Sequence, residues 1–111
     1  MDAYRMIDKL VDSLDGLAMA RGMLPRTGCV SDGIDRIFDL ISASLDCGGV
    51  TIICPAEGDD FDPRMHQCAR VDGNTGENDY VVSGVVSVGY YVDGRLKRPA
   101  SVCVIPKHRF S

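Results

Sequence analysis

The sequence has no run of apolar residues approaching the roughly 20 that an α-helix needs to cross a bilayer. Residues 1–5 also lack the basic patch and apolar core of a targeting segment. We therefore expect a cytoplasmic protein without a membrane partner. Internal repeats and low-complexity segments are absent too, so the sequence does not indicate a repeat array or a long disordered linker.

Paired cysteine motifs are also missing. The five cysteines are odd in number, and none belongs to a Cys-x-x-Cys pair, which is a common spacing for zinc ligands. In a cytoplasmic protein they are expected to be reduced thiols. We therefore predict neither a disulfide nor a metal for Cys29, Cys47, Cys54, Cys68 and Cys103.

Positive charge is in deficit. Twelve Lys and Arg residues against 16 Asp and Glu give a net charge of −4, which argues against a nucleic-acid partner. Hydrophobic residues make up 45% of the 111 residues, as in an ordinary globular chain. This length suits one compact domain, or a small domain with a helical appendage.

Two amphipathic helices are predicted in the first half of the chain, because apolar residues recur there at helical spacing. The first covers residues 3–20. The second starts with Ser31, a good N-cap residue, and stops at Gly48-Gly49. A connection of about ten residues favours an antiparallel helical hairpin.

One such hairpin cannot bury two wide apolar faces by itself. Pairing with a second copy of the chain would bury both and form a four-helix bundle. We therefore expect a homodimer through a helical region at residues 1–49. The predicted interface residues are Ile7, Leu10, Val11, Leu14 and Leu17 in the first helix and Ile34, Ile37, Phe38, Ile41 and Leu45 in the second.

From Val50 onward the pattern becomes strand-like. Short β-branched segments separated by polar turns predict a compact antiparallel sheet or small barrel over residues 50–111. The fold class is therefore α+β, with the helical hairpin followed by a small antiparallel β-domain. The predicted strands are residues 50–54, 66–71, 80–92 and 96–105, with Gly84 and Gly89 as bulges or points of close approach.

The most informative segment is residues 89–104. Two valine-rich runs flank Asp93-Gly94, a dipeptide that favours a type I′ hairpin turn. Arg95 and Lys97 follow the turn, and strand alternation places them opposite Leu96 and Arg98, so Arg98 is expected to be structural. Taken alone, an exposed hairpin arginine is most often solvated and without a partner.

This segment resembles the C-terminal signature of the GrpE family: Gly-Tyr, then Gly-Arg, then Arg-x-Ala, then alternating valines. Residues 61–69 are similar to a second family motif, an apolar residue followed by Asp-Pro-x-x-His-x-Ala. The resemblance is strong over residues 61–104 and weaker over residues 31–60. Over residues 4–20 it rests on the Leu-Val-Asp-Ser-Leu-Asp of residues 10–15.

The resemblance implies a nucleotide exchange factor of the DnaK-type heat-shock chaperone, one that binds the chaperone's ATPase domain and promotes ADP release. It implies that Arg95 and Lys97 bind this partner, with Met65 and Val104 as apolar contacts. The family usually carries a long coiled-coil stalk before the bundle. Only two residues precede the first predicted helix here, so we expect a short form without the stalk. The alternative is a GrpE-fold structural or assembly module without exchange activity.

An enzyme is not expected. His66 and Cys68 share a strand face, but nothing else needed for a nucleophilic or metal site is placed around them. Asp59, Asp60 and Asp62 lack the ligand alternation of a calcium loop, and local turn bonds explain them better. The glycine-rich segments lack the spacing and lysine of a phosphate-binding loop. No cofactor is therefore predicted.

Overall fold

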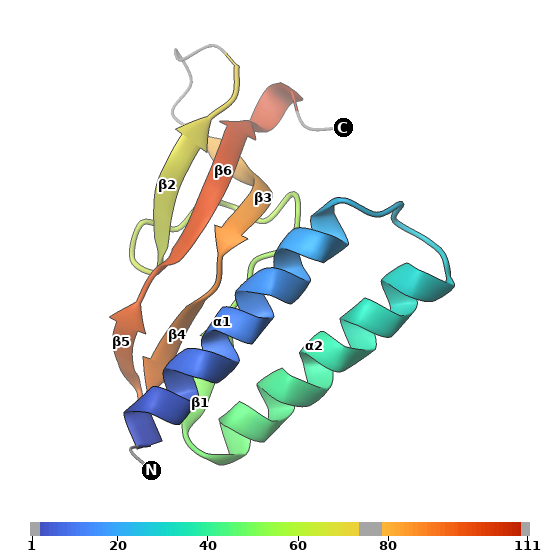
Figure 1. The fold of residues 1–111 in the computed structure, drawn as a ribbon. Coiled ribbons are helices and arrows are strands. Elements are labelled where there is room, and N and C mark those ends of the chain that lie inside the picture. Colours follow the sequence, from blue (N-terminus) through green and yellow to red (C-terminus); the bar gives the residue numbers. More distant parts are fainter. Residues whose placement is uncertain (1–2, 74–78, 110–111) are drawn as a thin grey trace.

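The fold begins with the predicted helical hairpin. The computed structural model describes residues 3–73 and 79–109 (Figure 1). Helix α1 (Ala3–Gly22) and helix α2 (Cys29–Cys47) lie side by side, and a β-domain follows (Figure 1). The α+β class and the order of helices before strands are thus confirmed. Neither helix is long and apolar enough, within the described residues, to span a membrane.

Helix α2 starts three residues earlier than predicted. Gly28 precedes the helix at φ 138°, and the Gly28 carbonyl accepts the first helical hydrogen bond from the Asp32 amide, at 3.0 Å. Ser31 is therefore not an N-cap but a buried residue of the first turn. Its hydroxyl donates to the Pro25 carbonyl at 2.6 Å, which ties the connecting loop to the helix.

Within residues 3–73 and 79–109, the strands form two sheets of three. This differs from the single sheet or barrel that was predicted, and one pairing, that of β2 with β6, is parallel. All other strand pairs are antiparallel. The first sheet has the order β1 (Val50–Ile53), β4 (Gly89–Val92), β5 (Arg95–Arg98), and the second β2 (His66–Val71), β6 (Ala100–Pro106), β3 (Tyr80–Ser87).

The two long predicted strands are each broken where the chain passes from one sheet to the other. Val88 separates β3 from β4, and Pro99 separates β5 from β6. At this crossing the backbone of Gly89 packs directly against that of Ala100, since a Cβ on Gly89 would lie 2.4 Å from the Ala100 nitrogen. Gly89 is therefore a point of close approach, as predicted, and the ladder register shifts between Val82 and Gly84.

The helices pack on the first sheet and share one core with it. Figure 1 shows this sheet beside α1 and α2, with the second sheet projecting past the helices. The buried residues of this core are Val11, Leu14, Leu45, Val50 and Val88. A second core inside the β-domain contains Ile53, Val82, Ala100, Val102 and Val104.

This packing corrects the predicted dimer interface. Val11, Leu14 and Leu45 are buried within the single chain, so they are core residues and not a surface for a second copy. The prediction overlooked that the first sheet presents its own apolar face to the helices. Ile37, by contrast, remains 48% exposed. The other predicted residues, which are only partly buried, are Ile7, Leu10, Leu17, Ile34, Phe38 and Ile41.

Candidate functional site

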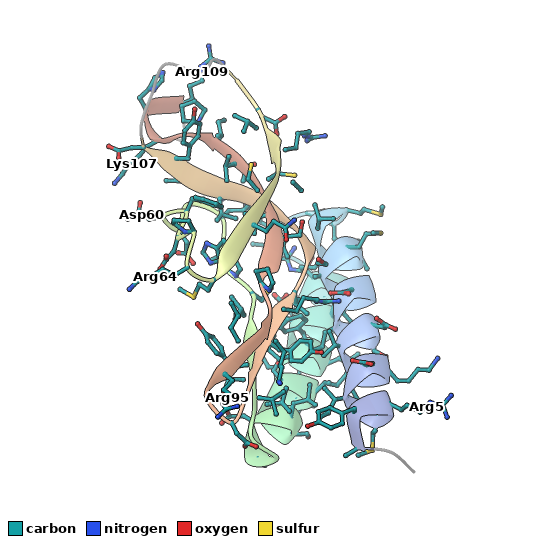
Figure 2. All side chains as sticks on the ribbon, turned by 90° about the vertical axis from the view of Figure 1, so that its left-hand side faces the viewer. Arg5, Asp60, Arg64, Arg95, Lys107 and Arg109 are labelled. Carbon is teal, nitrogen blue, oxygen red and sulfur yellow. The ribbon has the colours of Figure 1, made fainter. Side chains whose placement is uncertain are left out.

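The β4–β5 hairpin has the predicted turn. Asp93 and Gly94 both have positive φ, 49° and 80°, as a type I′ turn requires. Arg95 and Lys97 follow it and are exposed. Within residues 3–73 and 79–109, neither cation forms a hydrogen bond or an ion pair. Figure 2 shows Arg95 at the end of this hairpin, with Arg5 on the far side of the molecule.

A β-bulge changes the faces of the side chains in β5. Tyr90 pairs with Arg98 and Tyr91 with Leu96, so Lys97 is an extra residue on β5. Arg98 and Leu96 therefore lie on opposite faces, and the prediction that they share one is wrong. The same bulge turns Arg98 to the face of Tyr90, which packs toward the helices.

Arg98 is indeed structural. Its guanidinium donates to both carboxylate oxygens of Asp15 on α1, at 3.1 and 3.0 Å, and its Nε donates to the Val88 carbonyl at 2.8 Å. The Asp15 carboxylate also accepts from the Val88 amide at 2.7 Å. Both polar backbone groups of buried Val88 are thereby satisfied, where the chain leaves one sheet for the other.

The hairpin is fixed at two further points. The Asp93 amide donates at 2.9 Å to the carbonyl of Gly49, which lies in the two-residue connection between α2 and β1. Tyr90 Oη donates to the Asp8 carboxylate at 3.3 Å, and burial, followed by the charge of Asp8, raises the Tyr90 pKa. The positions of Arg95 and Lys97 are thus set by α1 and by the connection after α2, as well as by the turn.

The two apolar residues predicted to contact a partner have different surroundings. Met65 is partly buried and packs against the second core. Val104 is only 3% exposed and belongs to that core. Alternate residues of β6 point inward, and Val104 is one of them. Val104 therefore offers no surface, and we remove it from the candidate site.

Asp62 and His66 form a local turn. The Asp62 carbonyl accepts from the His66 amide at 2.8 Å, and the Asp62 amide donates to His66 Nδ1 at 3.0 Å. His66 is buried beside the ring of Phe61, as expected of a core histidine. Hydrogen bonds from the Arg64 side chain and backbone lower the pKa of the Asp62 carboxyl to about 2.

The cysteines are free thiols, scattered over α2, β2, β6 and the loop after β1. Among the described residues, no three His, Cys, Asp or Glu side chains come together as metal ligands would. Asp59 takes part in a turn, since its carboxylate accepts from the Ala56 amide at 2.9 Å. The Asp59 amide in turn donates to the Ala56 carbonyl at 3.1 Å, so the two residues close a local turn in the loop.

Asp15 is the residue of this region that the sequence reasoning missed. It lies one helical turn after Val11 and directly after Leu14, at the edge of the buried stripe of α1. A carboxylate at that edge signals a partner from another element, because half-buried charges are usually paired. Gly49 was predicted only as a helix stop, and its contact with Asp93 could not be read from the sequence.

Comparison with known proteins gives one consistent family. The profile of the GrpE family matches residues 3–106. A protein named Protein GrpE from Coxiella burnetii is 30% identical over 103 residues, which cover 93% of this chain and 49% of that protein. Its counterpart from Bartonella bacilliformis is 34% identical over 104 residues, covering 93% and 46%. The chain spans about half the length of these curated relatives.

Proposed function

This chain belongs to the GrpE family, and we propose that it is a nucleotide exchange factor that binds the ATPase domain of a DnaK-type chaperone and promotes ADP release. The observation that carries the proposal is the β4–β5 hairpin. Arg95 and Lys97 are exposed and free of ion pairs in the described part of the chain, on a hairpin held by α1 and by the connection after α2. Arginine at such a position can bind a carboxylate with two hydrogen bonds.

The mechanism is a shift of population and involves no bond chemistry. A factor that binds the open, nucleotide-free ATPase domain better than the ADP-bound form must weaken ADP binding by the same ratio. The chain then acts as a non-enzymatic wedge, with Arg95 and Lys97 as charged contacts and Met65 as an apolar one. It needs no nucleotide site or cofactor of its own, and we propose that it works in the cytoplasm.

We also propose that the chain forms a homodimer through the outer face of its helices. Several apolar residues stay exposed there although the inner face is buried. Ile37 is 48% exposed and its neighbour Leu40 is 57% exposed, while Met6 on α1 is 50% exposed. Exposed apolar side chains that cluster on one face usually mark an interface. Leu10, Leu17 and Ile41 pack against the first core but are only partly buried, and their exposed parts would extend the same surface.

The alternative is an assembly module that binds a partner without accelerating ADP release. The two functions differ in one measurement, the dissociation of a fluorescent ADP analogue from a DnaK-type ATPase domain. We expect this chain to accelerate dissociation, with a rate that saturates as its concentration rises, and Arg95→Ala to require a higher concentration. Binding without acceleration would favour the assembly module, and absence of both would overturn the proposed function.

A further inference from the structure

We propose that Asp15 and Arg98 are positioning residues: their ion pair locks the β4–β5 hairpin at one angle to α1 and thereby holds Arg95 and Lys97 where the partner can bind them. The inference rests on the proposed function. Neither residue is a partner contact itself, because the side chains of Asp15 and Arg98 are only 24% and 35% exposed and face each other.

The location of the pair supports this role. Val88 joins β3 to β4, and the chain there belongs to neither sheet. An amide and a carbonyl in such a gap have no strand partner, and Asp15 and Arg98 supply both bonds. A contact that replaces the strand ladder at a crossing fixes the direction in which the chain leaves it.

The pair is also well placed to transmit this direction to the hairpin. Arg98 ends β5, the same four-residue strand that Arg95 begins. Its guanidinium lies 5.9 Å from the centre of the Tyr90 ring on the neighbouring strand β4. A rotation at Val88 would therefore carry β4, β5 and both exposed cations with it.

Without the pair, the hairpin would be held only by its ladder to β1 and by the Tyr90–Asp8 and Asp93–Gly49 bonds, so it would sample a wider range of angles, of which only some suit the partner. The apparent dissociation constant then rises in inverse proportion to the fraction of molecules at the right angle. The maximal rate of ADP release is unchanged, since binding selects the correct angle. A residue that only stabilised the fold would change neither quantity while the protein remained folded.

The test compares Asp15→Ala with Asp15→Asn, which keeps an acceptor for the Val88 amide but loses the charge. Asp12→Ala, at an exposed carboxylate on the same helix, is the matched control. Circular dichroism first selects a temperature at which every variant is fully folded. Residual dipolar couplings of amides in α1 and in β4–β5 then report the angle between them, and ADP release gives the half-saturating concentration and the maximal rate.

For the wild-type chain and Asp12→Ala we expect one alignment tensor to fit both elements. Asp15→Ala should require two tensors and raise the half-saturating concentration roughly five- to thirtyfold at an unchanged maximal rate, with Asp15→Asn in between. One tensor in Asp15→Ala, or an unchanged half-saturating concentration, would overturn the inference. A wild-type chain that did not accelerate ADP release would overturn the proposed function, and the couplings would still decide whether the pair sets the angle.

Discussion

The guanidinium of Arg98 and the carboxylate of Asp15 lie 3.0 Å apart although 83 positions separate them in the sequence. This one contact joins the first helix to the last hairpin and satisfies the backbone of Val88 between them. Partly buried pairs of this kind contribute modest stability. Their larger consequence here is geometric, because the exposed cations of the hairpin depend on an element formed at the other end of the chain.

Arg95→Ala should weaken binding to the ATPase domain without destabilising the fold. The side chain is exposed and unpaired in the described part of the chain, so its loss should change the free energy of unfolding by less than about 0.5 kcal/mol. A bidentate contact at an interface is worth about 1–2 kcal/mol, or roughly five- to thirtyfold in affinity. Calorimetric titration measures this, and Arg5→Ala on the opposite side serves as the control. Equal affinities of Arg95→Ala and the wild-type chain would remove Arg95 from the site.

Replacing each of two glycines with alanine should change the free energy of unfolding in opposite directions. Gly49 has φ 86°, where a side chain is strained, and a new Cβ would lie 2.4 Å from the Asp93 carboxylate. That carboxylate can rotate away, so the backbone strain is the larger effect. We expect Gly49→Ala to lower the free energy of unfolding by about 1–2 kcal/mol. Gly16 lies within α1 with nothing within 4 Å of an added Cβ, so Gly16→Ala should gain about 0.5–1 kcal/mol. Urea denaturation at one fixed protein concentration compares them, and equal effects would contradict the assigned turn geometry.

How much the sequence predicts depends on the range of the contacts involved. Asp93-Gly94 specifies its own turn, so the hairpin was correctly predicted from two residues. The break at Val88 depends on Asp15 and on the approach of Gly89 to Ala100, both distant in the chain. The parallel pairing of β2 with β6 is equally nonlocal, since no local pattern records which strand lies beside which.

The same reasoning explains the errors at the candidate site. The family resemblance suggested Val104 as a partner contact. In the structure β6 lies between β2 and β3, and the alternation of inward and outward residues along β6 buries Val104. Val11 and Leu14 have the spacing of a helical interface, and that spacing does not distinguish a sheet of the same chain from a second copy. In each case the sequence correctly indicates an apolar contact but does not indicate which part of the structure makes it.

Arg64→Gln should make the protein less sensitive to acid. In the folded chain Arg64 lowers the Asp62 pKa from 3.8 to about 2. A lowered carboxyl pKa contributes stability that is fully present above pH 3.8 and is lost as the pH falls toward 2. The NMR resonance of the Asp62 carboxyl should therefore titrate near pH 2 in the wild-type chain and closer to pH 3.8 in Arg64→Gln. The difference in the free energy of unfolding between the wild-type chain and Arg64→Gln should shrink as the pH falls from 4 to 2. The difference between the wild-type chain and Arg95→Gln should not change over this range.

Ile37→Asp should convert the proposed dimer to a monomer while leaving the fold intact. Ile37 is 48% exposed on α2, so a charge there is tolerated in the single chain. In a dimer it would be buried, and losing one isoleucine contact from each copy costs about 3 kcal/mol or more in total, at least roughly a hundredfold in the dissociation constant. Val71→Asp, at an apolar residue that is 42% exposed on β2, provides the control and should leave association unchanged.

Leu14→Asp is a different substitution, because Leu14 is 0% exposed inside the chain and an aspartate there should unfold it. Sedimentation equilibrium separates these cases once circular dichroism has shown which variants are folded. We expect a dimer mass for the wild-type chain and Val71→Asp, and a monomer mass for folded Ile37→Asp. A monomer mass for the wild-type chain at high micromolar concentration would overturn the proposed dimer. The exposed residues of α2 would then have to be a surface for another partner, since the sheet already covers the opposite side of the helices.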